Sequence, residues 1–219
     1  MPESIIERRR AESLRPCADL PSQEKILEIA ETLFARRGFQ GVGLREVARL
    51  SGLSKSALFH HFPSKLDLYS AVLHRILTRI DETLSTHTST ADGPGPMRKL
   101  LDRIEALVDA LAASPTQAPL LLRSLFEPEV AELQNAEVTA RLQNIIAGFS
   151  NLISEGIAAG EIRSVPVPHA LQGLIGMLVF HFASGDFGDE LLGKPVFSSG
   201  EIKRHKEYVV SLIANGLAA

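Results

Sequence analysis

Apolar residues recur every three or four positions along most of this chain, which is the spacing of one helix face. The first such stripe consists of Ile26, Ile29, Ala30, Leu33 and Phe34. Ser22 precedes it as a candidate N-cap, and two arginines followed by Gly38 end it. The pattern therefore predicts a first helix that begins near Ser22.

Two short helices and a long one are predicted next. The first short helix carries Leu44, Val47, Ala48 and Leu50 and ends at Ser51-Gly52. The second runs from Lys55 to about His61, with Ser54 as its cap. Ser64 followed by Asp67 three residues later is a capping-box pattern, which predicts a helix over about residues 65–85.

The rest of the chain continues the helical pattern. It predicts helices over residues 97–113, 120–126, 129–159, 169–184 and 201–217, and a Gly-rich loop over residues 185–200. No stretch alternates with the period of two that strands require. The predicted fold is therefore all-α, with about nine helices. Three parts are expected: a flexible tail (1–21), a helix-turn-helix domain (22–68) and a helical body (69–219).

Composition is that of an ordinary globular protein, with 45% apolar and 22% charged residues among 219. The single cysteine, Cys17, cannot form an intrachain disulfide, which fits a reducing compartment. No secretory signal is visible, and the most apolar segment, residues 171–183, is shorter than the ~20 residues that span a bilayer. We expect a cytoplasmic protein without a membrane segment.

The charge is unevenly distributed along the chain. The overall net charge is −3, yet residues 1–65 contain 11 Lys and Arg against 8 Asp and Glu. This balance favours a nucleic-acid-binding N-terminal part on an acidic body. In the tail, Arg8, Arg9 and Arg10 are either part of a solvated extension or an arm that touches DNA.

The turn Ser51-Gly52-Leu53-Ser54 is the feature that points to function. A short glycine-containing turn between two short helices is the helix-turn-helix arrangement. Leu58 and Phe62 are expected to pack inward, so that the helix from Lys55 presents its N-terminal end to a major groove about 12 Å wide. The alternative is a generic helical hairpin whose polar residues are merely solvated.

An ordered series of motifs decides between these two interpretations. The series consists of Ile26–Ala30, Leu33-Phe34, Gly38-Phe39, Val47-Ala48, Ser51–Lys55, Leu58–Phe62 and Lys65–Leu68. It resembles the TetR/AcrR family of bacterial regulators over about residues 22–73. The resemblance implies a homodimer with an N-terminal three-helix DNA-binding head. It also implies a helical body that binds a small effector and dimerises through the last two helices.

The resemblance also implies which side chains contact operator DNA. The places that contact bases correspond to Arg45, Lys55, Ser56 and His60, and those that contact phosphates correspond to Phe59, His61 and Lys65. Phe59 stands where the family usually has Tyr, and Gly43 stands where it usually has Thr or Ser. Both departures remove a contact to the DNA backbone. They leave open a second hypothesis, a binding module that has lost DNA recognition.

The helix over residues 169–184 is apolar almost all round. Leu171, Leu174, Ile175 and Leu178 form one face, and Gly173, Gly176 and Phe180 form another. We expect one face in the core and the other at a dimer interface, beside Ile202, Val209, Ile213 and Leu217 of the last helix. The alternative is a helix buried within a single chain.

A pocket for a small hydrophobic effector is expected in the body. Its candidate lining residues are Phe126, Phe149, Met177 and His181. Such residues at helical spacing also occur as ordinary core, which is the alternative. His60 and His61 are adjacent and point about 100° apart, so a shared metal is not expected. No catalytic or cofactor motif is recognised, and we expect a transcriptional repressor, not an enzyme, that its effector releases from the operator.

Overall fold

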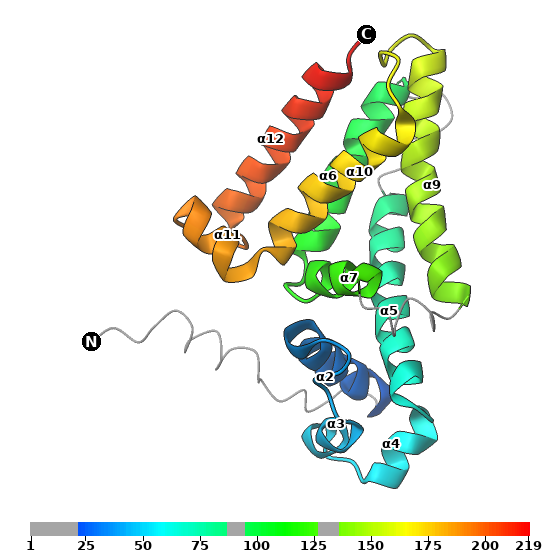
Figure 1. Ribbon diagram of the computed structural model, residues 1–219, viewed down its shortest axis with the longest axis vertical. Helices are drawn as coiled ribbons and strands as arrows, with labels where there is room; N and C mark the ends of the chain where they lie inside the picture. Colours follow the sequence, from blue (N-terminus) through cyan, green and yellow to red (C-terminus); the bar gives the residue numbers. More distant parts are fainter. Residues whose placement is uncertain (1–21, 87–94, 127–135) are drawn as a thin grey trace. The chain divides into compact units, whose positions relative to one another are not determined.

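The computed structural model describes residues 22–86, 95–126 and 136–219 (Figure 1). The described residues form ten α-helices and no strand, so the predicted all-α fold of about nine helices is confirmed. The predicted tail (1–21) and residues 129–135 of the predicted helix 129–159 lie outside the described residues. The chain divides into two compact units at Val72 and Leu73, here called the head and the body.

The head contains three short helices and the beginning of a long one. These are α2 (Ser22–Arg37), α3 (Leu44–Ser51), α4 (Lys55–His61) and α5 (Lys65–Thr86), which continues into the body. The core of the head includes Ile26, Val47 and Leu58, which are completely inaccessible to solvent. An ion pair between Arg37 and Glu46, at 2.8 Å, joins α2 to α3 at the surface.

Aromatic rings fix the first turns of α5 within the head. Tyr69 is fully buried, and its ring meets those of Phe34 and Phe39 edge-on, with centroids 4.9 and 5.3 Å away. Ser64 caps the helix, since its Oγ accepts a hydrogen bond from the Asp67 N–H at 3.1 Å. The predicted start of this helix is confirmed, and edge-to-face packing of the rings adds to its attachment.

The body consists of the rest of α5 and six further helices. These are α6 (Pro96–Ala112), α7 (Gln117–Phe126), α9 (Ala136–Ala158), α10 (Val167–Ala183), α11 (Gly185–Leu192) and α12 (Ser199–Leu217). Figure 1 shows α12 and α9 running along α6, and α10 crossing in front of α6; α10 contacts both α7 and α9. The buried face of α6 includes Leu100, Ile104 and Leu111, so α6 is the central helix of this bundle.

Helix α11 corrects the prediction of a loop over residues 185–200. A Cβ added to Gly188 would lie 2.0 Å from Ser184 Oγ and 2.9 Å from Val196 Cγ1, so this glycine permits close packing inside a helix. Asp189 Oδ1 then accepts a hydrogen bond from the Val196 N–H at 2.8 Å. Glycine content suggested a loop because composition does not distinguish a turn from a close helix contact.

The segment between α9 and α10 closes the end of the body. Glu161 Oε2 accepts a hydrogen bond from the Met97 N–H at 3.0 Å, which satisfies a free donor at the start of α6. Arg163 donates to the Gly216 carbonyl at 2.6 Å and thereby holds the end of α12. Among the described residues no single helix is both long and apolar enough to cross a bilayer, and α10 with α11 meets that test only as a pair bent by 91°.

Candidate DNA interface and effector site

Gly52 makes the turn between α3 and α4. Its φ of 73° lies in the left-handed region, which costs glycine little because it has no Cβ. Its N–H donates to the carbonyls of Ala48 and Arg49, and the Leu53 N–H donates to Ala48 at 2.9 Å. The free carbonyls at the end of α3 are thus satisfied while the chain reverses.

Helix α4 begins at a side-chain cap and is anchored by two apolar residues. Ser54 Oγ accepts a hydrogen bond from the Ala57 N–H at 3.1 Å. Leu58 is fully buried and Phe62 is 4% exposed. The predicted inward packing of these two residues is confirmed, and it fixes which face of α4 is directed to solvent.

The predicted DNA-contacting side chains lie on the open surface of the head, with one exception. Those that are exposed are Arg45 on α3 and Lys55, Ser56, Phe59, His60 and His61 on α4. Lys65 is half-buried: its Nζ donates to the Gln40 carbonyl at 3.4 Å and lies 4.5 Å from the centroid of the Phe39 ring. The structure therefore brings six of the seven side chains to the surface around the turn, and it engages the seventh within the head.

The two departures from the family pattern have distinct local consequences. The Lys55 ammonium lies over the Phe59 ring, 5.1 Å from its centroid, so Phe59 orients a cation although it has no hydroxyl to donate. Gly43 occupies the N-cap of α3 with no side-chain hydrogen bond, and its carbonyl accepts from Glu46 and Val47 N–H groups. Helix α3 thus forms without the usual Thr or Ser.

The four predicted effector-lining residues occupy different environments in the body. Phe149 on α9 is 4% exposed, whereas Phe126 at the end of α7 is 74% exposed. Met177 and His181 on α10 are half-buried. His181 stacks on His205 of α12, with ring centroids 3.7 Å apart and an interplanar angle of 5°. The pocket assignment stays a prediction.

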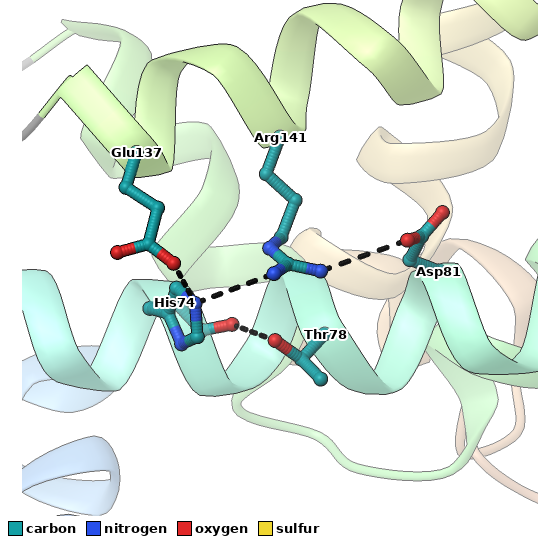
Figure 2. A network of polar contacts seen from close by, with 5 residues as sticks. All are labelled: His74, Thr78, Asp81, Glu137 and Arg141. Carbon is teal, nitrogen blue, oxygen red and sulfur yellow. Dashed lines mark hydrogen bonds and ion pairs between the residues drawn. The ribbon is translucent and has the colours of Figure 1, made fainter.

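A polar network connects α5 with α9 inside the body (Figure 2). His74 Nε2 is 2.8 Å from Glu137 Oε1 and 3.5 Å from an Arg141 nitrogen, and Arg141 also pairs with Asp81 at 3.6 Å. Figure 2 shows Arg141 reaching across from α9 to lie between His74 and Asp81 on α5. The network therefore ties the part of α5 that belongs to the body to α9.

Arg103 on α6 is a half-buried charge that the sequence pattern did not reveal. Its Cζ lies 5.0 Å from the centroid of the Phe149 ring, and its Nε is buried without a hydrogen-bond partner. Burial lowers the pKa of this guanidinium, and the Asp81 carboxylate opposes that shift. A signal did exist, because Arg103 falls three residues after Leu100 and four before Leu107, on the apolar stripe of its helix.

Both α10 and α12 expose large apolar side chains to solvent. Phe180, Tyr208 and Leu212 are 53%, 65% and 43% exposed. Gly173 and Gly176, which the sequence predicts on the same face as Phe180, are exposed as well. For α12 the expected set is wrong in part, because Val209 and Ile213 are buried in the core of the body. Tyr208 and Leu212 are instead the large apolar side chains that α12 exposes.

These features define a class: an all-α protein with a capped helix-turn-helix head and a separate helical body. Residues 26–72 match the family described as bacterial regulatory proteins, tetR family. The helix-turn-helix transcriptional activator FasR of Mycolicibacterium smegmatis is 30% identical over 172 residues, which cover 74% of each chain. The chain therefore belongs to the TetR family and is a helix-turn-helix transcriptional regulator.

Two further relatives widen the comparison. The transcriptional repressor KstR2 of Mycolicibacterium smegmatis is 28% identical over 160 residues, covering 66% of this chain and 72% of that protein. The crystal structure of AibR in complex with isovaleryl coenzyme A and operator DNA superposes with a TM-score of 0.70 at 19% identity, over 88% of this chain and 97% of AibR. At that identity the superposition demonstrates a common fold.

Proposed function

We propose that this regulator is a repressor that binds operator DNA through α4 and leaves it when a small hydrophobic effector occupies the body. The observation that carries the proposal is the capped N-terminus of α4, held by buried Leu58 and Phe62 with its remaining polar side chains exposed. Among the exposed side chains, Lys55 and Ser56 stand where free backbone N–H groups and the helix dipole also attract phosphate.

The proposed contacts to DNA follow the expectation from sequence. Arg45, Lys55, Ser56 and His60 contact base edges, and Phe59, His61 and Lys65 lie along the phosphates. Because Lys65 already donates to the Gln40 carbonyl, its part is to add positive charge beside the backbone. Phe59 contributes through the ammonium of Lys55 that it orients.

We also propose a homodimer that acts in the cytoplasm and joins through α10 and α12. A dimer with two-fold symmetry binds two half-sites about 34–36 Å apart, on successive turns of one duplex face. The apolar residues that α10 and α12 expose support this arrangement, because contiguous exposed apolar surface commonly marks an interface.

The relatives support the choice of a ligand-responsive repressor. KstR2 is named a repressor, and the AibR crystal contains both an acyl thioester and operator DNA. FasR is named an activator, so the direction of regulation is open to a direct reporter test. If the protein is a repressor, deletion of its gene raises transcription from the bound promoter. If it is an activator, the same deletion lowers transcription.

Band-shift titration against the DNA upstream of the protein's own gene tests the proposal. We expect Lys55→Ala to weaken specific binding by about tenfold or more, since one base or phosphate contact contributes about 1–3 kcal/mol. The matched control is Lys203→Ala, which removes an exposed lysine of the body that pairs with Glu207 on its own helix at 3.8 Å. Equal affinity of both variants, or binding without sequence preference, contradicts the proposal.

A further inference from the structure

The body holds a half-buried positive charge, that of Arg103, where α5, α6 and α9 meet. Arg103 extends from α6 to lie against the Phe149 ring of α9, and the Asp81 carboxylate of α5 interacts with its charge. The Nε atom of Arg103 is buried without a hydrogen-bond partner. Placing a guanidinium in such surroundings costs free energy unless an anion or further acceptors compensate it.

The carboxylate nearest to this charge is shared. Asp81 also pairs with Arg141 of α9 at 3.6 Å, as Figure 2 shows. Glu137, the other carboxylate of the network, lies 2.8 Å from His74 at its far end. The Asp81 carboxylate therefore interacts with two guanidinium groups, so its charge does not fully compensate both. Arg103 can consequently bind a further anion.

Gly148 on α9 keeps space for the Arg103 side chain. A Cβ at this position would lie 2.6 Å from an Arg103 terminal nitrogen and 2.9 Å from its Cζ. Glycine in the middle of a helix costs roughly 0.5–1 kcal/mol relative to alanine. The absence of a side chain here is what permits the guanidinium to reach the Phe149 ring.

The surroundings of Arg103 are otherwise apolar. Leu100 and Leu107, which share the face of α6 that carries Arg103, are fully buried and half-buried, respectively, and Ile145 of α9 is 7% exposed one turn before Phe149. A ligand that reaches Arg103 thus meets a planar cation with two parallel donors at one end and aliphatic or aromatic carbon around it. Such a fork matches carboxylate and phosphate oxygens in the same bidentate way.

We propose that the effector of this regulator is an apolar molecule with an anionic head group, carboxylate or phosphate, and that Arg103 binds this head group. The proposal rests on the effector response proposed above, because it names the chemical class of that effector. The bound anion would replace Asp81 as the counter-charge of Arg103, and Asp81 could then pair with Arg141 alone. The Phe149 ring lies against the guanidinium and helps to position it.

Isothermal titration calorimetry of the full-length protein, without DNA, tests the inference with octanoate, octyl phosphate and octanol. We expect at least one anion to bind about ten- to hundredfold more tightly than octanol, as for hydrogen bonds to a charged group. The relative affinity of octanoate and octyl phosphate identifies the head group. Equal binding of octanol and both anions, or no binding of either anion, overturns the inference.

Variants locate the effect at Arg103. Arg103→Met should bind octanol as before and lose the preference for the anion, and Arg103→Lys should restore part of it. The matched control, Arg98→Met, removes an exposed arginine of the same helix that pairs with Asp102 and should retain the preference. Should Arg103→Met fail to fold, Gly148→Ala gives a second test, since it displaces the guanidinium and keeps the charge. Retention of the full preference in either variant overturns the inference.

The outcome separates this inference from the proposed function. A protein that binds octanoate or octyl phosphate through Arg103 but recognises no operator contradicts the repressor proposal alone. A protein that binds its operator and leaves it with octanol, but with neither anion, contradicts the effector class alone.

Discussion

Gly52 shows how one residue determines the orientation of α4 relative to α3. Its left-handed φ of 73° lets the Leu53 N–H reach the Ala48 carbonyl, which reverses the chain within two residues. An added Cβ would meet only Lys25 Nζ, at 4.0 Å, so space does not limit this position. The requirement for glycine therefore comes from the backbone conformation.

We expect Gly52→Ala to lower the free energy of unfolding by about 1–2 kcal/mol, the cost of the left-handed conformation for a residue with a Cβ. Gly43→Ser is the matched control, because Gly43 has a φ of −104° and a Cβ added there would have nothing within 4 Å. It should raise stability by about 0.3 kcal/mol by capping α3. Urea unfolding followed by circular dichroism measures both changes, and equal losses in the two variants would disprove the backbone explanation.

At the scale of elements, two stacked imidazoles join α10 to α12. His181 and His205 lie face to face, and the Nε2 atom of each is buried without a hydrogen-bond partner. Burial lowers the pKa of His205 to about 4, with a further contribution from the neighbouring His181. Burial also lowers the pKa of His181, against the opposing effect of Glu201 on α12. Burial in the contact between these helices therefore favours the neutral form of both rings.

This arrangement predicts a loss of stability in acid. Because the folded pKa of His205 is lowered, the unfolded chain binds more protons once the pH falls below about 6.5. The free energy of unfolding should be highest above that pH and should decrease as the pH falls from 6.5 toward 4. His205→Phe keeps a flat ring in the stack and removes this part of the decrease.

Urea midpoints measured across that pH range check the prediction. His169→Gln is the control, since it removes an exposed histidine from the first turn of α10 and should leave the pH dependence as in the unaltered protein. If His205→Phe shows the same pH dependence as the unaltered protein, protonation of the stacked histidines does not cause the loss of stability in acid.

At the scale of the whole molecule, the apolar side chains that α10 and α12 expose bear on the proposed assembly. Phe180 of α10 and Tyr208 and Leu212 of α12 are all more than 40% exposed. The adjacent Gly173 and Gly176 have nothing within 4 Å of an added Cβ, so another helix could approach closely there. Together these features are the basis for the proposed homodimer.

We expect the double variant Phe180→Glu with Leu212→Glu to be a monomer, because carboxylates would be desolvated at the interface. Light scattering after size exclusion should then give the mass of one 23.8 kDa chain. Operator affinity should fall by about a hundredfold or more, since the two heads no longer bind as one unit. Leu125→Glu, at an exposed leucine of α7, is the control and should leave the mass unchanged. A double variant with the mass of the unaltered protein contradicts the assignment of this face.

Prediction from sequence succeeded where neighbours along the chain provide the contact. Ser54 caps α4 through the Ala57 N–H, and Ser64 caps α5 through the Asp67 N–H, each three residues away. The inward positions of Leu58 and Phe62 follow from a spacing of four on one helix face. For the same reason the inward and outward faces of α4 could be predicted, whereas the set of DNA-contacting side chains came from the resemblance to the TetR family.

It failed where a residue's role depends on partners distant in sequence. Gly188 lies in a helix, where Ser184 and Val196 pack closely against it. The glycine content of residues 185–200 had suggested a loop. Val209 and Ile213 are apolar like Leu212, and only the position of α6 shows which of them is buried. The assignment of the last helix to a dimer face was correspondingly wrong for those two residues.

The sequence alone thus determined the helical class of the protein and the residues that present α4, because helix periodicity and capping act over three or four residues. Tertiary structure decided the partial burial of the Arg103 charge, the stacking of His181 on His205 and which residues α12 exposes. Each of these depends on helices far apart in the chain, and burial of a charged or aromatic group is a property of the packed bundle as a whole.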